Sequence, residues 1–134
     1  MILDSNILIA IFQNEHPDWF EKLAGWQIAQ TIHINLVIFA EVAPSFTETD
    51  ALQSALAELG LQIAEITLDD AYRAGCAFAE YRRRGGSRET ILPDFLIGAQ
   101  AEMRGWPLVT RDRKGFASYF PNLEIIDPME PPRD

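Results

Sequence analysis

The sequence is poor in cysteine and histidine and has no long apolar run. Cys76 is the single cysteine among 134 residues, so an intramolecular disulfide is excluded and a reducing, cytoplasmic setting is expected. The two histidines lie far apart, which disfavours a zinc site. No stretch reaches the roughly 18 apolar residues that span a bilayer, and no basic segment precedes the apolar start. We therefore expect no membrane partner and no signal peptide, and a Cys76 side chain that is small and buried.

Positive charge is also scarce. The chain has 11 lysines and arginines against 20 acidic residues, which gives a formal net charge of -9. This balance disfavours non-specific binding to nucleic acid and suits a divalent cation or a basic protein partner. The basic residues nevertheless form two clusters, RRRGGSR at 82–88 and TRDRK at 110–114. Each cluster is equally consistent with a solvated helix end or loop.

Short apolar segments alternate with helical patterns along the chain. Strands are expected at 2–3, 31–35, 61–66, 108–110 and 123–126. Helices are expected at 6–14, 17–30, 36 to about 44, 49–59, 68 to about 84 and 93–104. This alternation predicts one α/β domain around a mostly parallel sheet, spanning residues 1–127. The proline-rich acidic segment 128–134 is expected to be a frayed tail.

Four carboxylates stand in apolar surroundings. Asp4 interrupts MILDSNILIAIF, and Glu41 is the only charge in INLVIFAEVAP. Asp94 precedes FLIGAQA, and Asp112 comes just after the expected strand PLVT. Each has a simple structural interpretation: Asp4 and Asp94 as helix N-caps, Asp112 as a turn residue, and Glu41 as the polar face of a largely buried helix. Yet a buried carboxylate without a partner is costly, so these positions call for an explanation.

A shared site would explain all four carboxylates together. The carboxyl ends of parallel strands and the first turns of the following helices meet at one edge of a sheet. Four ionised carboxylates cannot gather there unless a cation balances them. Mg²⁺ takes such oxygen ligands, and an all-carboxylate magnesium site serves phosphoryl chemistry by activating a water and positioning a phosphodiester.

The segments MILDSNILI, INLVIFAEV, ILPDFLIGAQA and PLVTRDRKGF carry a resemblance to a known family. In this order they resemble the PIN-domain ribonucleases, and within them the VapC-type toxins of toxin–antitoxin pairs, over residues 4 to about 127. The resemblance implies a three-layer α/β/α PIN-like domain with Mg²⁺ or Mn²⁺ as cofactor and RNA as substrate. It also implies cleavage that leaves 5′-phosphate and 3′-hydroxyl ends.

The resemblance assigns a role to each of the four carboxylates. Asp4 and Asp94 match the surest metal ligands of the family, and Asp112 would complete the metal site. Glu41 matches the fourth catalytic carboxylate, which would act through a bound water, either as a ligand or by orienting the nucleophile. All four are therefore expected to be catalytic.

Neighbouring polar residues are expected to support the first carboxylate. Ser5 and Asn6 follow the family's D-[ST]-N opening and would fix the carboxylate by hydrogen bonds. Thr110 is a further candidate at a strand end, although it could equally be an ordinary strand threonine. The chain departs from many relatives at Leu36, where proline is common, and at Gln100, where a histidine is often seen. We expect these two differences to affect helix entry and packing only.

The expected partners are RNA, an antitoxin and a second copy of the chain. Basic residues of the two clusters would contact the RNA backbone: Arg82, Arg83, Arg84, Arg88, Arg111, Arg113 and Lys114. The resemblance implies a VapB-like antitoxin that places a basic side chain in the acidic pocket, and a homodimer. Ile11 and Phe12 could supply the dimer surface, or could equally belong to the core.

Three other functions compete with this interpretation. A PIN-domain ribonuclease could act in RNA processing or decay outside toxin–antitoxin systems. A phosphatase of the haloacid dehalogenase type would need a second aspartate two residues after Asp4, where this chain has Asn6. A non-enzymatic, magnesium-binding receiver-like domain would need a lysine near the last strand, and Lys22 and Lys114 do not form that pattern convincingly.

Overall fold

Five short strands form one parallel sheet in the computed structural model, which describes residues 1–86 and 92–130. The strands are β1 (Ile2–Leu3), β2 (His33–Ile34), β3 (Gln62–Ile63), β4 (Leu108–Val109) and β5 (Ile125–Ile126). Their order in the sheet is β3-β2-β1-β4-β5, so β1 is central. All four neighbouring pairs are parallel, so the sheet is entirely rather than mostly parallel.

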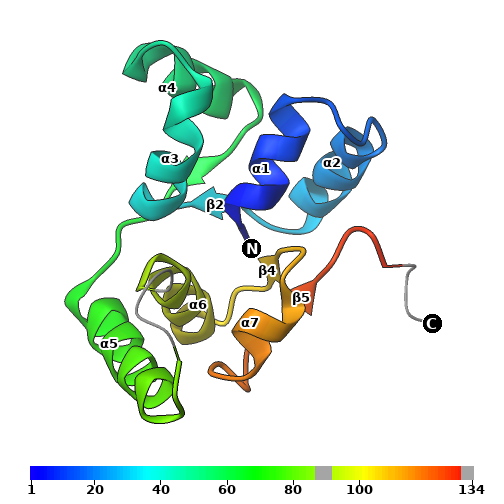
Figure 1. Ribbon diagram of the computed structural model, residues 1–134. Helices are drawn as coiled ribbons and strands as arrows, with labels where there is room; N and C mark the ends of the chain where they lie inside the picture. The colour runs from blue at the N-terminus through cyan, green and yellow to red at the C-terminus, as the bar shows by residue number, and fades with distance from the viewer. Residues whose placement is uncertain (87–91, 131–134) are drawn as a thin grey trace.

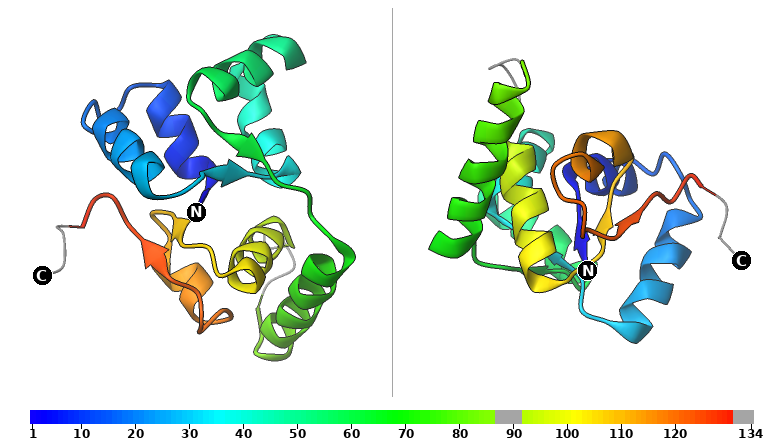
Figure 2. Two further views of the ribbon diagram at one scale, coloured as in Figure 1. Left: turned by 180° about the vertical axis from the view of Figure 1, so that it is seen from behind. Right: turned by 90° about the horizontal axis from the view of Figure 1, so that it is seen from below.

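Helices cover both faces of this sheet. They are α1 (Ser5–Phe12), α2 (Trp19–Ala29), α3 (Leu36–Val42), the 3₁₀ turn η1 (Ala43–Ser45), α4 (Thr49–Glu58), α5 (Leu68–Arg83), α6 (Leu92–Arg104) and α7 (Arg113–Ala117). Figures 1 and 2 show α1 to α4 on one side of the strands and α5, α6 and α7 on the other. The chain adds β2 and β3 on one side of β1 and then β4 and β5 on its other side. Because crossovers between parallel strands are right-handed, the two directions place their helices on opposite faces of the sheet. The expected three-layer α/β/α fold is confirmed.

The two central strands form the middle of the core. Ile2, Leu3, Leu108 and Val109 are all fully buried, as expected for a parallel sheet covered on both faces. Leu3 pairs with Val109, and the backbone N–H of Asp4 donates to the Val109 carbonyl at 2.9 Å. The residues that follow β1 and β4 therefore emerge side by side at the carboxyl edge of the sheet.

Polar side chains begin several helices at this edge. The Asn35 side chain accepts a hydrogen bond from the Ile38 N–H at 3.0 Å and caps α3, while Asp4 caps α1. Asp112 caps α7 by accepting from the Gly115 N–H at 3.1 Å. The sequence indicated only a turn at this position, because a five-residue helix is too short to show a helical period.

Two expectations about burial are wrong. α3 buries Ile38 and Val42, but its opposite face is exposed, including Glu41 and Leu36, which is 64% exposed. A short apolar helix at the edge of the domain covers the sheet with one stripe only. Cys76 is also exposed, because α5 turns Ala74 and Ala77 rather than Cys76 toward the core.

Ile11 is buried in the core, so the core alternative holds for this residue. Phe12 is half-buried and packs edge-to-face on Phe46 with the ring centroids 5.1 Å apart. The suggestion that Phe12 supplies a dimer surface stays a prediction. Within the part of the chain that the structure describes, no helix is long and apolar enough to cross a membrane.

The start of the predicted tail is attached to the domain. Pro128 is buried, and its carbonyl accepts a hydrogen bond from Lys22 Nζ of α2 at 3.1 Å. Arg113 forms an ion pair with Glu130 at 3.1 Å. Residues 128–130 are therefore not frayed, whereas 131–134 lie outside the described residues, and the domain boundary at 127 stays a prediction.

Candidate acidic site

Four separate segments bring the four carboxylates to the carboxyl edge of the sheet. Asp4 follows β1, and Asp112 follows the adjacent strand β4. Asp94 lies in the first turn of α6, the helix that leads back into β4. Glu41 lies on α3, which follows β2 and packs against both α1 and α6. The topology thus brings together residues that are far apart in the sequence, such as Asp4 and Asp112, which are 108 positions apart.

Asp4 is the most deeply buried of the four. Its side chain accepts hydrogen bonds at both oxygens, from the Ser5 N–H at 2.8 Å and from Thr110 Oγ1 at 2.8 Å. Only 4% of the residue is exposed. Asp4 therefore caps α1, as the structural interpretation proposed, and also points into the acidic group, because the charge of Asp112 acts on its pKa.

The Thr110 hydroxyl joins two of the acidic segments. It donates to Asp4 and accepts hydrogen bonds from the Asp112 N–H at 3.1 Å and from Asn6 Nδ2 at 3.4 Å. Thr110 is fully buried, so these contacts are sheltered from water. They fix the backbone of Asp112 relative to the carboxylate of Asp4, which an ordinary strand threonine would not do.

Ser5 and Asn6 lie beside the site in different ways. Ser5 supports Asp4 through its backbone N–H, which donates to Asp4 Oδ1 at 2.8 Å. Asn6 contacts Thr110 rather than Asp4, and its Oδ1 accepts from the backbone N–H of residue 111 at 3.5 Å. Asn6 would therefore support Asp4 through Thr110.

The carboxylates interact electrostatically in a partly dry environment. Burial raises the pKa of Asp94 to about 6, with further contributions from the charges of the other three carboxylates. Burial also raises the pKa of Asp4, against the opposing hydrogen bonds from Thr110 and Ser5. Burial and the charge of Asp4 likewise raise the pKa of Glu41. The group holds more negative charge than its surroundings compensate.

This donor set fits a hydrated divalent cation. Across residues 1–86 and 92–130, no three Asp, Glu, His or Cys side chains stand close enough to enclose one ion directly. The charges of neighbouring carboxylates nevertheless help to raise the pKa of Asp4, Glu41 and Asp94, and all four side chains offer hard oxygen donors. Mg²⁺ prefers such donors, keeps several waters and usually takes only one or two carboxylates.

Two buried amides, which the sequence did not mark as site residues, hold α3 and α6 together. Asn35 Nδ2 donates to Gln100 Oε1 at 2.8 Å, and Gln100 Nε2 donates to the Glu65 carbonyl at 3.0 Å. Both amides are fully buried. They link the helix that carries Glu41 to the helix that carries Asp94. The signal in the sequence was a polar residue inside each of the apolar stretches INLVIF and FLIGAQA.

The basic cluster at the end of α5 is largely paired within the helix. Arg83 and Arg84 both form ion pairs with Glu80, the latter at 3.0 Å. The Arg82 guanidinium lies 6.0 Å from the centroid of the Phe78 ring. These side chains are exposed, so the cluster is a solvated helix end whose arginines remain accessible.

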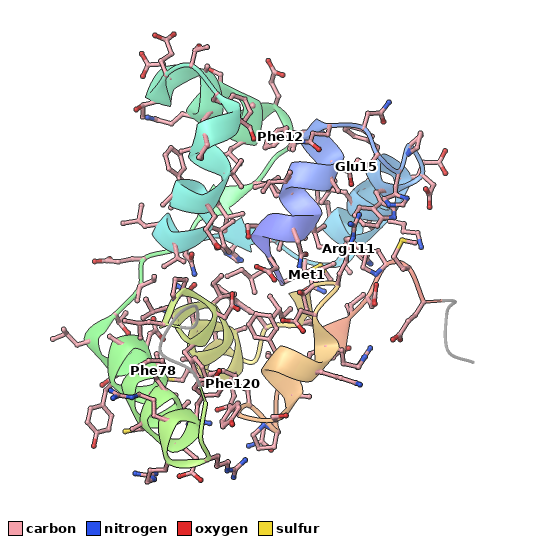
Figure 3. All side chains as sticks on the ribbon, viewed as in Figure 1. Met1, Phe12, Glu15, Phe78, Arg111 and Phe120 are labelled. Atoms are coloured by element: carbon pink, nitrogen blue, oxygen red, sulfur yellow. The ribbon has the colours of Figure 1, made fainter. Side chains whose placement is uncertain are left out.

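The two arginines around β4 contact other parts of the chain. Arg113 pairs with Glu130 and so attaches the C-terminal segment. The Arg111 guanidinium lies 4.8 Å from the centroid of the Trp19 ring and 3.5 Å from Glu15, at the α1–α2 end of the molecule (Figure 3). Arg111 and Arg113 therefore contact the α1–α2 end and the C-terminal segment, away from the arginines at the end of α5.

A pocket of about 280 Å³ adjoins the acidic group. It is lined by Tyr81, Asp94, Phe95, Asp112, Lys114, Gly115, Phe116, Tyr119 and Phe120. Lys114 is exposed and has no side-chain partner among the residues that the structure describes. Arg88, the last member of the predicted basic set, lies outside the described residues.

Comparisons with known proteins agree with this architecture. No curated protein sequence matches the chain significantly. One similar structure is the VapBC2 complex of Rickettsia felis bound to promoter DNA, with a TM-score of 0.74 and 22% identity over 93% of this chain and 96% of that one. A toxin–antitoxin complex from Klebsiella pneumoniae has a TM-score of 0.72 and 28% identity over 96% of this chain and 98% of that one. DNA-bound VapBC from Salmonella typhimurium has a TM-score of 0.73 and 20% identity over 94% of this chain and 96% of that one. The family model for the PIN domain matches residues 1–119. The chain therefore belongs to the PIN-domain family.

Proposed function

We propose that the protein is a metal-dependent endoribonuclease toxin of the VapC type. The observation that carries the proposal is the convergence of four carboxylates from separate segments, with the pKa of Asp94 raised to about 6. Uncompensated acidic charge of this kind suits a divalent cation and a phosphodiester substrate. Membership of the PIN family supports nuclease activity, and the similar toxin–antitoxin structures support the toxin assignment.

In the proposed reaction, Asp4, Asp94 and Asp112 would hold a hydrated Mg²⁺ or Mn²⁺, one or two of them directly and the rest through its waters. Bound there, the ion would neutralise phosphate charge and lower the pKa of a water. Glu41 is exposed and its pKa is raised, which suits it to orient the attacking water and accept its proton. In-line attack on phosphorus would leave a 5′-phosphate and a 3′-hydroxyl end.

Thr110 and Ser5 would keep the carboxylates in position. The Thr110 hydroxyl and the Ser5 N–H each hold one oxygen of Asp4, and each of these oxygens keeps a second lone pair that could face the cation. The Ser5 N–H, which donates to Asp4 at 2.8 Å, favours the ionised form of that carboxylate. Hydrogen bonds of this kind orient metal ligands and tune their affinity.

The proposed partners are RNA, an antitoxin and a second copy of the chain. The Klebsiella structure is a toxin–antitoxin complex, and the Rickettsia and Salmonella structures are VapBC complexes with DNA. By analogy, a VapB-like antitoxin would bind this chain and place a basic side chain against the acidic group. The net charge of -9 suits a basic partner segment. We place this complex in the cytoplasm.

The proposal is tested by expressing the wild type and Asp94→Asn side by side and sequencing the 5′ ends of cellular RNA. We expect new 5′-phosphate ends and growth arrest with the wild type only. Asp50→Asn, an exposed aspartate in the first turn of α4, is the matched control and should behave as the wild type. Identical RNA profiles for wild type and Asp94→Asn would refute nuclease activity. Equal cleavage by the purified protein in EDTA would refute the metal.

A further inference from the structure

The pocket beside the acidic group has aromatic walls. Tyr81 and Tyr119 meet edge-to-face with their ring centroids 5.6 Å apart, and both are half-buried. Behind them Phe95 packs on Tyr119 at 5.3 Å and on Phe120 at 5.8 Å between centroids. Figure 3 shows Phe120 on the side of α6 where α7 lies. Aromatic faces of this kind stack with nucleic-acid bases regardless of sequence.

The floor of the pocket is rigid. Phe95, Phe116 and Phe120 are at most 3% exposed, so their positions are fixed by packing. A β-carbon at Gly98 of α6 would come within 2.5 Å of the Phe120 ring, so only glycine lets the ring lie against the helix. A site that is already formed loses little conformational entropy when a ligand enters it.

The size of the pocket limits what can enter. Its volume is about 280 Å³. Pockets for drug-sized molecules usually measure about 300–1,000 Å³, so this one suits a single small ring system. A base that has left its stack meets this limit, whereas a base pair or several residues of a peptide do not.

Two cationic side chains lie beside the pocket. Lys114 lines the pocket and is exposed. The Arg84 guanidinium lies 5.3 Å from the centroid of the Tyr119 ring and is 58% exposed, although it also pairs with Glu80. On a chain with a net charge of -9, two such cations beside an aromatic pocket favour a polyanion over an apolar protein side chain.

The pocket and the acidic group share two residues. Asp94 and Asp112 belong to the carboxylate group and also line the pocket. We propose that the pocket receives one unstacked base of single-stranded RNA, next to the phosphodiester that is cut. The inference rests on the proposed function for the position of the cut. Single-stranded RNA presents such splayed bases, whereas paired RNA hides them.

Kinetics on a short RNA that spans one mapped cleavage site test this proposal. Removing one base next to the cut, by an abasic substitution, should raise KM by roughly 10- to 100-fold with little change in kcat. Tyr119→Ala should raise KM for the intact RNA similarly, and the abasic substitution should then add little. Tyr119→Phe keeps the ring and should match the wild type. Tyr72→Ala, at an exposed tyrosine elsewhere on α5, is the control.

A binding measurement separates this proposal from the proposed function. Asp4→Asn keeps an N-cap residue and leaves the pocket lining intact, so it serves as a non-cleaving protein. In EDTA it should bind at least one of four labelled homopolymeric pentanucleotides, measured by fluorescence anisotropy. Adding Tyr119→Ala should weaken that binding roughly 5-fold or more, and adding Tyr72→Ala should not.

Each outcome has a distinct meaning. If the wild type cleaves no RNA, the proposed function fails, and the pentanucleotide measurement alone decides the pocket. If the wild type cleaves but neither Tyr119→Ala nor any abasic position changes KM, the base pocket is refuted and the nuclease stands. If Tyr119→Ala weakens only the binding of an antitoxin, a protein side chain fills the pocket and the proposal is overturned. Urea unfolding verifies that Tyr119→Ala remains folded.

Discussion

Asp94→Asn should stabilise the metal-free protein. In the wild type the ionised Asp94 is partly buried among three other carboxylates, and its pKa rises to about 6 from an ordinary value of 3.8. The folded state therefore holds this proton more tightly than the unfolded state does. Stability falls as the pH rises between these two values and stays low above them. An amide at this position removes the charge and keeps the shape.

The expected magnitude follows from the two pKa values. The difference between the raised and the ordinary pKa of Asp94 lowers the unfolding free energy of the wild type by about 3 kcal/mol at pH 7.5. At pH 5 the wild type is destabilised by roughly half as much. Asp94 also lies in the first turn of α6, where a negative charge is favourable by about 0.3–1 kcal/mol. Asp94→Asn should therefore raise the free energy of unfolding by about 2–3 kcal/mol at pH 7.5 in EDTA.

Urea unfolding in EDTA at pH 5 and pH 7.5 measures this effect. Asp50→Asn is the control, because Asp50 occupies the first turn of α4, is exposed, and reports the helix-end contribution alone. With Mg²⁺ present, the difference in unfolding free energy between Asp94→Asn and the wild type should become smaller or change sign, because ion binding stabilises the wild type. The reasoning is refuted if Asp94→Asn is no more stable than the wild type at pH 7.5, or if the gain does not shrink at pH 5.

The remaining predictions concern the uncharged residues around the site. Thr110→Val removes the side-chain donor to Asp4 and should weaken Mg²⁺ binding about 10- to 100-fold by calorimetry, whereas Thr110→Ser should not; equal affinities would contradict this role. Gln100→Leu leaves Asn35 Nδ2 without its acceptor in a fully buried place and should cost about 1–3 kcal/mol in urea unfolding. Gln53→Leu, on the exposed face of α4, should change stability little, and a similar small change for Gln100→Leu would refute the link.

The order of elements could be predicted from the sequence because the two central strands are apolar and the longer helices show a helical period. The strands at 2–3 and 108–110 contain only apolar residues and one threonine, which is typical of a parallel sheet buried on both faces. The α7 helix could not be predicted, because a hydrogen bond from Gly115 to Asp112 rather than an apolar stripe defines it. The exposed face of α3 was missed because LVIFAEV is apolar on every side.

The four carboxylates could be found because three of them interrupt apolar segments and Asp112 comes just after an apolar strand. The supporting contacts could not be found in this way. Thr110 contacts Asp4 across 106 positions, and Gln100 contacts Asn35 across 65, and neither pair has a local signal in the sequence. The pocket is similar, because its rings come from α5, α6, α7 and the segment after α7, and each ring alone resembles an ordinary core residue.

The distribution of charge explains how an acidic protein can act on RNA. Interactions between exposed charges are screened beyond about 10 Å, so a net charge of -9 acts at close range and repels the RNA backbone over most of the surface. Arg83 and Arg113 are already paired with glutamates and do not offset this repulsion. Among the described residues, we expect attraction at the cation site and at Lys114 and Arg84 beside the aromatic pocket. Binding that depends on these few adjoining contacts favours selective over general RNA cleavage, because most RNA gains nothing from the rest of the surface.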